Sequence, residues 1–275
     1  MLKKIREFTY RYAIVSSLLM AVLFVLLMNG TDLIFYLLPH SVLLQYAQEI
    51  CVMLYSVGLV LLLGFKSTFT SKGFFKGLMY AAVVIGLMLF SIGRFCLNAM
   101  SNPDAEWASV GMILLGLVQA IGIGVREECF FRGAIQNVLA KRYANSVKGV
   151  WGAALIGAAI FGLVHLLNIF AGYDPWVVLI QTISAVGTGL FFAAVYLRSG
   201  NLWAAILVHA LIDTAALAGS VFLTQTRVET VNGLSWGSLA GMVFYVVPAL
   251  VLLRPSKCRE IVARFSAQRE EKLPE

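Results

Sequence analysis

The chain consists of long apolar runs separated by short polar segments, and eight of these runs have the roughly 20 apolar residues that a membrane-spanning helix needs. They lie at about 12–38, 42–64, 74–97, 107–139, 149–168, 176–197, 202–221 and 236–253. The pattern predicts an all-α, polytopic membrane protein folded as a bundle of eight transmembrane helices. The first and fourth runs are longer than one bilayer is thick, so we expect these helices to tilt or to extend beyond the membrane.

Composition excludes the other broad classes of protein. Of the 275 residues, 60% are hydrophobic and only 13% are charged, with a mean hydropathy of +0.86. Soluble domains carry about 25% charged residues, so ordinary globular, disordered, collagenous and coiled-coil chains are ruled out. The four cysteines are scattered singly, which predicts neither a zinc ribbon nor a disulfide framework. No basic segment is interleaved with aromatic residues, so we expect no nucleic-acid partner.

The basic residues predict the orientation. The net charge is +7, and 17 of the 21 Lys and Arg residues fall on one side if both ends of the chain are cytoplasmic. The first run has no small-residue cleavage site, so we expect it to be retained. We predict one integral membrane domain over residues 1–275, with a basic tail at 254–275 that forms a solvated or membrane-surface helix. The compact, single-domain form of the chain is typical of a multi-pass protein of the bacterial inner membrane.

Charged residues within the runs are the first candidates for function, because a charge in a bilayer costs about 2.5–3.5 kcal/mol on insertion scales. Glu128 and Arg132 are four residues apart, as are His209 and Asp213, so each pair shares one helix face. Taken singly, each group has a plainer interpretation. Glu128 and Arg132 would belong to a rim of cytoplasmic charges, His165 would be a packed polar residue, and His209 and Asp213 would share an internal hydrogen bond. The full set of ionisable residues in the runs is Glu49, Arg94, Arg126, Glu127, Glu128, Arg132, His165, His209 and Asp213.

Depth in the membrane brings most of these residues together. At about 1.5 Å per residue, Glu127 and Asp213 each lie roughly 18 Å from the cytoplasmic end of their helices, His165 roughly 24 Å and His209 roughly 12 Å. Carboxylates and imidazoles in one layer compensate one another's desolvation and are the groups that activate water. Glu49 and Arg94 both fall in the outer half of the membrane. We therefore predict a separate structural ion pair between them, near Gln45 and Gln48.

Three motifs then carry a resemblance. Glu127-Glu128-x-x-x-Arg132, Phe161-x-x-x-His165 and His209-x-x-x-Asp213 resemble, in order, the three signature motifs of the CPBP (CAAX protease and bacteriocin-processing, or Abi) family of intramembrane metalloproteases. The similarity predicts a catalytic core at about 107–221. Asp213 stands where the CAAX-processing branch of the family has Asn, which leaves a prenylated substrate open.

The resemblance implies an endopeptidase that acts on membrane-associated peptides or proteins within the lipid bilayer. Its catalytic set would be Glu127, Glu128, His165, His209 and Asp213, with Arg132 as the structural partner of Glu128. Glu127 and His165 would activate water, while His209 and Asp213 would stabilise the oxyanion or join in metal binding. Zn²⁺ or another divalent metal would be held by Glu127, His165, His209 and Asp213. No His-Glu-x-x-His stretch is present, and a metal-free water stays equally open.

Two other functions remain open from the sequence. The first is a non-catalytic membrane protein of the same fold, acting in immunity, as a chaperone or as a regulator. The second is a transporter or channel, since ionisable residues in a membrane often mark ion paths. The chain shows no internal repeat with paired broken helices, which is the pattern that favours a transporter.

Overall fold

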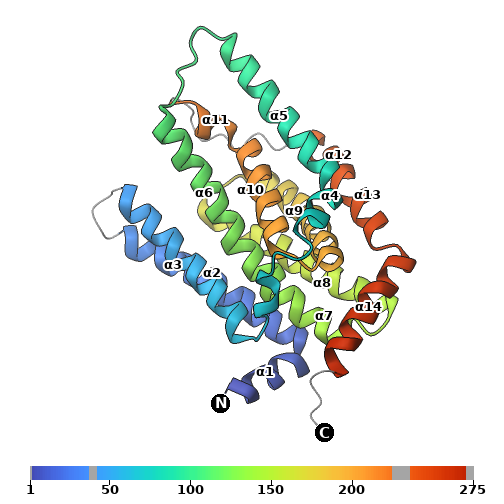
Figure 1. Cartoon of the computed structure of the whole chain (residues 1–275). Coiled ribbons are helices and arrows are strands. Elements are labelled where there is room, and N and C mark those ends of the chain that lie inside the picture. Colours follow the sequence, from blue (N-terminus) through green and yellow to red (C-terminus); the bar gives the residue numbers. More distant parts are fainter. Residues whose placement is uncertain (1, 37–41, 225–235, 271–275) are drawn as a thin grey trace.

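The computed structural model describes residues 2–36, 42–224 and 236–270, and helices make up nearly all of this part (Figure 1). The α-helices are α1 (Leu2–Arg11), α2 (Ala13–Tyr36), α3 (Val42–Leu62), α4 (Phe74–Tyr80), α5 (Ala82–Met100), α6 (Val110–Glu128), α7 (Asn137–Tyr143), α8 (Val147–His165), α9 (Pro175–Ser199), α10 (Leu202–Ala216), α11 (Ala218–Phe222), α12 (Trp236–Gly241), α13 (Val243–Leu252) and α14 (Pro255–Glu270). Two short 3₁₀ helices, η1 (Lys66–Phe69) and η3 (Leu166–Ala171), and one π-helix, η2 (Cys129–Gln136), complete the set.

The described residues confirm an all-helical, multi-pass membrane protein and identify fewer full spans than the sequence predicts. Five helices are long and apolar enough to cross a bilayer, and a sixth is counted if the bent pair Leu239–Leu252 and Pro255–Ala267 is one span. Tyr46–Leu62 and Leu202–Ala216 are shorter apolar helices. The eight-span count and the cytoplasmic placement of both ends therefore stay predictions.

Several apolar runs contain breaks that hydropathy does not reveal. The run at 74–97 divides into α4 and α5 near Ala81, and the run at 202–221 divides into α10 and α11. The run at 107–139 does the opposite and continues as a 34-residue helical stretch over Val110–Tyr143. This stretch is longer than one bilayer is thick, and its tilt or extension beyond the membrane stays a prediction. In the middle of the stretch lies the π-helix η2, whose eight residues are all buried.

Close packing of α9 and α10 against their neighbours forms the centre of the bundle. α9 packs along α8 and α13, α10 packs against α6, and α3 packs against α6 and η2. A Cβ atom on Gly124 would lie 2.8 Å from the carbonyl oxygen of Ile206, so only glycine allows α6 and α10 to approach this closely. A Cβ on Gly189 would lie 3.1 Å from Cα of Ala158, which brings α9 against α8 in the same way.

The start of α10 is fixed by Asn201, which is fully buried. Its Oδ1 accepts a hydrogen bond from the backbone N–H of Ala204 at 2.9 Å, which caps the helix. Its Nδ2 donates to the carbonyl oxygens of Thr70 and Lys72 at 2.6 and 3.2 Å. One side chain thus ties the first turn of α10 to the segment between η1 and α4 and sets the height of α10 in the bundle.

α1 and α14 lie at the same end of the helix bundle (Figure 1). The OH of Tyr10 on α1 donates to the carbonyl oxygen of Leu63 at 2.6 Å, which satisfies a backbone acceptor just beyond the end of α3. On α14, Glu260 accepts a hydrogen bond at 2.8 Å from Arg198, which lies at the end of α9 and is itself largely buried. The predicted tail helix is therefore present as α14 and is docked on the bundle.

Candidate active site

The first motif lies where α6 passes into the π-helix. Nη1 of Arg132 donates to Oε1 of Glu128 at 3.0 Å, and both side chains are buried, with 3% and 0% of their surface exposed. The predicted pairing of these two residues is therefore confirmed. Nη2 of Arg132 donates at 3.3 Å to the carbonyl oxygen of Gly189, so the same side chain links η2 to α9. π-helical turns occur often at functional sites, and this one carries Arg132.

His209 on α10 is the centre of the site. Its Nδ1 lies 2.7 Å from Oε1 of Glu128, the oxygen that also accepts the hydrogen bond from Arg132. An ionised carboxylate can only accept hydrogen bonds, so Nδ1 of His209 must carry the proton. The other nitrogen, Nε2, lies 3.7 Å from Oε2 of Glu127 and 3.7 Å from Oδ2 of Asp213. The predicted pairing of His209 with Asp213 is therefore present.

Glu127 faces a different partner from Glu128, as the sequence predicts for neighbours about 100° apart around a helix. While Oε2 of Glu127 faces His209, its Oε1 lies 3.8 Å from Nη2 of Arg126. The carboxylate therefore lies between two nitrogen groups and makes no direct hydrogen bond to either. Its side chain is 16% exposed, against 0% for Glu128, so Glu127 is the more accessible of the two glutamates.

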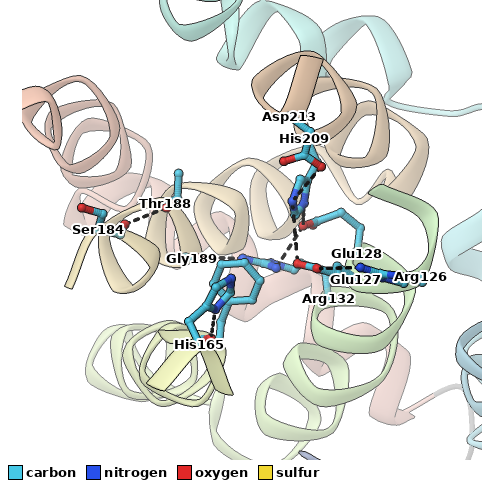
Figure 2. Close-up of polar contacts among 11 residues, drawn as sticks. Arg126, Glu127, Glu128, Arg132, His165, Ser184, Thr188, Gly189, His209 and Asp213 are labelled. Atoms are coloured by element: carbon cyan, nitrogen blue, oxygen red, sulfur yellow. Dashed lines mark hydrogen bonds and ion pairs between the residues drawn. The ribbon is translucent and has the colours of Figure 1, made fainter. Parts of the chain in front are cut away.

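His165 ends α8 and approaches the site from another side (Figure 2). Its Nδ1 lies 2.8 Å from the carbonyl oxygen of Phe161. Since a carbonyl oxygen only accepts, Nδ1 carries the proton, and in the neutral ring Nε2 is left as an acceptor. His165 is partly exposed and lies close enough to Glu127 to interact with it electrostatically.

Aromatic rings form the wall between these polar groups. The ring of Phe161 packs edge-on against that of His165 with centroids 4.9 Å apart, and the guanidinium carbon of Arg132 lies 4.4 Å from the same Phe161 ring centroid. Phe192 on α9 stacks on His209, with ring centroids 4.9 Å apart and an angle of 15° between the planes. These rings fix both imidazoles and give Arg132 cation–π partners.

Around His209, two buried carboxylate oxygens accept no hydrogen bond from the described part of the chain, namely Oε2 of Glu128 and Oδ2 of Asp213. Buried polar atoms in native proteins usually have hydrogen-bond partners, which are often bound water. These two atoms therefore mark the region around His209 as the place where donors from a water molecule or a substrate peptide can bind.

The predicted ion pair between Glu49 and Arg94 is wrong. Nη1 of Arg126 donates to Oε2 of Glu49 at 2.5 Å, whereas Arg94 is exposed on α5. Similar depth in a bilayer does not say which helices are neighbours, and α3 packs against α6. Gln48 is half-buried beside Glu49, and the side chain of Gln45 lies outside the described part of the structure.

As arranged, the donors do not fit a metal ion. Over residues 2–36, 42–224 and 236–270, no three His, Cys, Asp or Glu side chains are grouped so that they could hold a metal. The Nδ1 atoms of His165 and His209 are both hydrogen-bonded and leave Nε2 open on each ring, as in metal-ligating histidines, but three donors are not grouped around one point in the described residues. The metal set proposed from the sequence stays a prediction.

Three elements of the site have little or no signal in the sequence. Phe192 and Gly189 lie in an apolar run and join the site only because α9 packs against α8 and η2. Arg126 was visible as a charge within an apolar run, but its proximity to Glu127 depends on Glu49 from α3.

Residues 107–215 match the family model described as type II CAAX prenyl endopeptidase Rce1-like. The matched segment contains all three motifs. No curated protein matches the chain.

Proposed function

Because residues 107–215 match the family model of the type II CAAX prenyl endopeptidase Rce1-like proteins, we propose that this multi-pass membrane protein is an intramembrane protease that hydrolyses peptide bonds of membrane-associated peptides or proteins. A bacterial inner membrane is the location that we propose for it. The observation that carries the proposal is the position of His209, whose Nε2 faces Glu127 and Asp213 while Nδ1 is held by Glu128. This arrangement supports a base, a proton donor and an orienting carboxylate around one reacting centre.

In the first step, Glu127 and His165 activate a water molecule. Nε2 of His165 accepts one hydrogen bond from the water, and the carboxylate of Glu127 takes the other proton as the water oxygen attacks the peptide carbonyl carbon. Glu127 suits this role because it is the more accessible of the two glutamates and makes no direct hydrogen bond to its neighbours. A general base of this kind contributes about 10²–10⁴-fold to the rate.

In the second step, His209 stabilises the oxyanion that forms on the carbonyl oxygen. Protonated at both nitrogens, the ring keeps its bond to Glu128 and donates from Nε2 to the oxyanion, while Asp213 balances the positive charge. The C–N bond then breaks, and the proton held by Glu127 passes to the leaving amine. The products are a carboxylic acid and an amine, so the atoms of peptide and water are all accounted for.

Glu128 and Arg132 hold this arrangement in place. Both are buried, and Oε1 of Glu128 accepts hydrogen bonds from Arg132 and His209 together, so this oxygen is not available to a water molecule. We assign Glu128 as the residue that orients His209 and fixes its protonated nitrogen. Arg132 in turn holds Glu128 and links it to Gly189 on α9.

The test is cleavage by the purified protein in detergent micelles, read by mass spectrometry. Two peptides serve as probes, a CAAX-type peptide with a prenylated cysteine and the same peptide without the prenyl group. We expect Glu127→Gln and His165→Ala to lose at least about 10²-fold in kcat, while Arg94→Gln, on an exposed face of α5, stays within about twofold. Full activity in Glu127→Gln with either peptide would refute the mechanism.

The same preparation tests the metal. Elemental analysis of the protein, of Glu127→Gln and of His165→Ala measures any bound Zn²⁺ directly. Because the donors do not form a metal site as arranged, we expect less than one metal per chain and activity that survives dialysis against a chelator. A stoichiometric metal that is lost in both variants would instead identify Glu127 and His165 as ligands, as the sequence predicts.

A further inference from the structure

Glu49 and Arg126 form an ion pair that reaches the active site from outside the family-matched segment. Glu49 lies on α3, 77 residues before Arg126, and the pair is mostly buried, with 15% and 16% of the side chains exposed. The segment matched by the family model begins only at residue 107. The motifs therefore do not include Glu49, although it touches a residue adjacent to Glu127 in sequence.

The packing of α3 on α6 is shaped for this contact. A Cβ atom on Gly122, one turn before Arg126, would lie 3.1 Å from Cγ of Glu49 and 3.4 Å from its Oε1. Any other residue at this position would push the Glu49 side chain aside. The glycine thus provides space for Glu49 beside α6, which is a second observation that the two helices are fitted around this carboxylate.

The distances around Arg126 are unequal in a way that matters for catalysis. Its Nη1 is 2.5 Å from Oε2 of Glu49, whereas its Nη2 is 3.8 Å from Oε1 of Glu127. The first distance is a strong hydrogen bond between charged groups, and the second is too long for any hydrogen bond. The guanidinium is thus committed to Glu49 and affects Glu127 only through its charge.

We propose that Glu49 is a positioning residue that tethers Arg126 and so keeps Glu127 available as the base. This inference rests on the proposed function of Glu127. A free guanidinium beside a carboxylate forms a pair with two parallel hydrogen bonds. Released from Glu49, Arg126 turns toward Glu127, occupies the carboxylate oxygens and prevents them from accepting a proton from water. Glu49 prevents this rotation because its carboxylate holds Arg126 in a short hydrogen bond.

The proposal makes an unusual prediction for paired variants. Glu49→Gln keeps the size of the side chain but releases Arg126, so kcat falls about tenfold to a hundredfold, a part of what a general base supplies. Adding Arg126→Gln removes the competing guanidinium, so the double variant recovers to within about fivefold of the parent. Glu49→Asp keeps the charge and retains more activity than Glu49→Gln. A purely structural pair would also recover stability in the double variant, because no buried charge is left unpaired, so kcat is compared per folded molecule and the accessibility of Glu127 decides between the two roles.

A second readout requires no substrate. Dicyclohexylcarbodiimide, an apolar reagent for carboxyl groups, labels Glu127 at a rate that mass spectrometry of the corresponding peptide measures. We expect severalfold slower labelling in Glu49→Gln than in the parent, and a return to the parental rate in the double variant. Arg94→Gln is the matched control and leaves both rates unchanged.

The outcomes are distinguishable. A fully active Glu127→Gln variant would refute the proposed mechanism, whatever the labelling rates are. An inactive Glu127→Gln variant, together with a double variant no better than Glu49→Gln in both readouts, would overturn the tether alone. If Glu49→Gln does not accumulate as folded protein, the comparison of Glu49→Asp with the double variant decides in the same way.

Discussion

Replacing Glu128 tests how the buried charges at the centre of the bundle support one another. Glu128→Gln keeps the shape of the side chain but removes the charge that faces Arg132 at 3.0 Å. The amide oxygen can still accept a hydrogen bond from Arg132, as can the carbonyl oxygen of Gly189, and the Phe161 ring stays at 4.4 Å, but the compensating charge of Glu128 is lost. Leaving one partner of a buried ion pair uncompensated costs about 3–5 kcal/mol, so we expect the free energy of unfolding to fall by this amount.

The opposite change is expected to cost less. In Arg132→Met the carboxylate of Glu128 keeps its hydrogen bond from Nδ1 of His209 at 2.7 Å, and a protonated His209 replaces part of the lost positive charge. We therefore expect a loss of about 2–3 kcal/mol. The double variant leaves no uncompensated charge between the two positions and replaces a buried pair with neutral groups, which is often close to neutral. We expect it to lose only about 1–2 kcal/mol, which is less than either single variant.

The measurement is a double-mutant cycle of unfolding free energies in mixed micelles, with denaturing detergent as the titrant. These losses correspond to a favourable coupling of about 3–7 kcal/mol between the two positions. Circular dichroism before the titration controls for helix content. Strictly additive losses, or a more severe effect of Arg132→Met than of Glu128→Gln, would refute the reasoning from compensated charge.

Three further predictions follow from other contacts. Lys257 and Arg198 lower the pKa of Glu260 to about 2, so the docking of α14 is strongest above pH 4.5 and weakens as the pH falls toward 2. Hydrogen exchange of α14 measures this pH dependence, and Glu260→Gln is expected to remove it. Asn201→Ala loses the cap of α10 and is expected to cost about 1 kcal/mol or more in unfolding free energy, whereas Asn201→Ser, which can still cap the helix, is expected to lose less. Gly124→Ala introduces a Cβ 2.8 Å from a backbone oxygen of α10 and is expected to cost about 1–3 kcal/mol of unfolding free energy. It is also expected to lower kcat, because His209 moves with α10, and an unchanged kcat in folded protein would contradict this.

The pairs within single helices were predictable from spacing alone. Residues four apart share a helix face, and the structure has both Glu128 with Arg132 and His209 with Asp213 at ion-pair distance. The convergence of these two pairs was predictable from depth, since depth is fixed by counting residues from a helix end. Charge and hydropathy thus give most of the site, because burying a charge in a membrane is so costly that few positions carry one.

Contacts between helices were not predictable in the same way. Depth placed Glu49 beside Arg94, but α3 packs against α6, and the partner is Arg126. Which helices are neighbours depends on how small residues such as Gly122 and Gly124 let them approach, and a hydropathy profile does not contain this information. The stacking of Phe192 on His209 has the same origin, because nothing distinguishes this phenylalanine from others in the same apolar run.

The π-helix from Cys129 to Gln136 has a consequence for how this gene can vary. A π-turn accommodates one more residue than the α-helix around it, so deleting a single residue here would restore ordinary α-helical spacing. In an ordinary α-helix a deletion rotates every residue beyond it by about 100°, whereas here the lost residue removes the extra residue of the π-turn and leaves α7 on its present face. A deletion between Glu128 and Arg132 would still change the four-residue spacing on which their ion pair depends. Natural variation in length is therefore expected after Arg132 in this segment and not between Glu128 and Arg132.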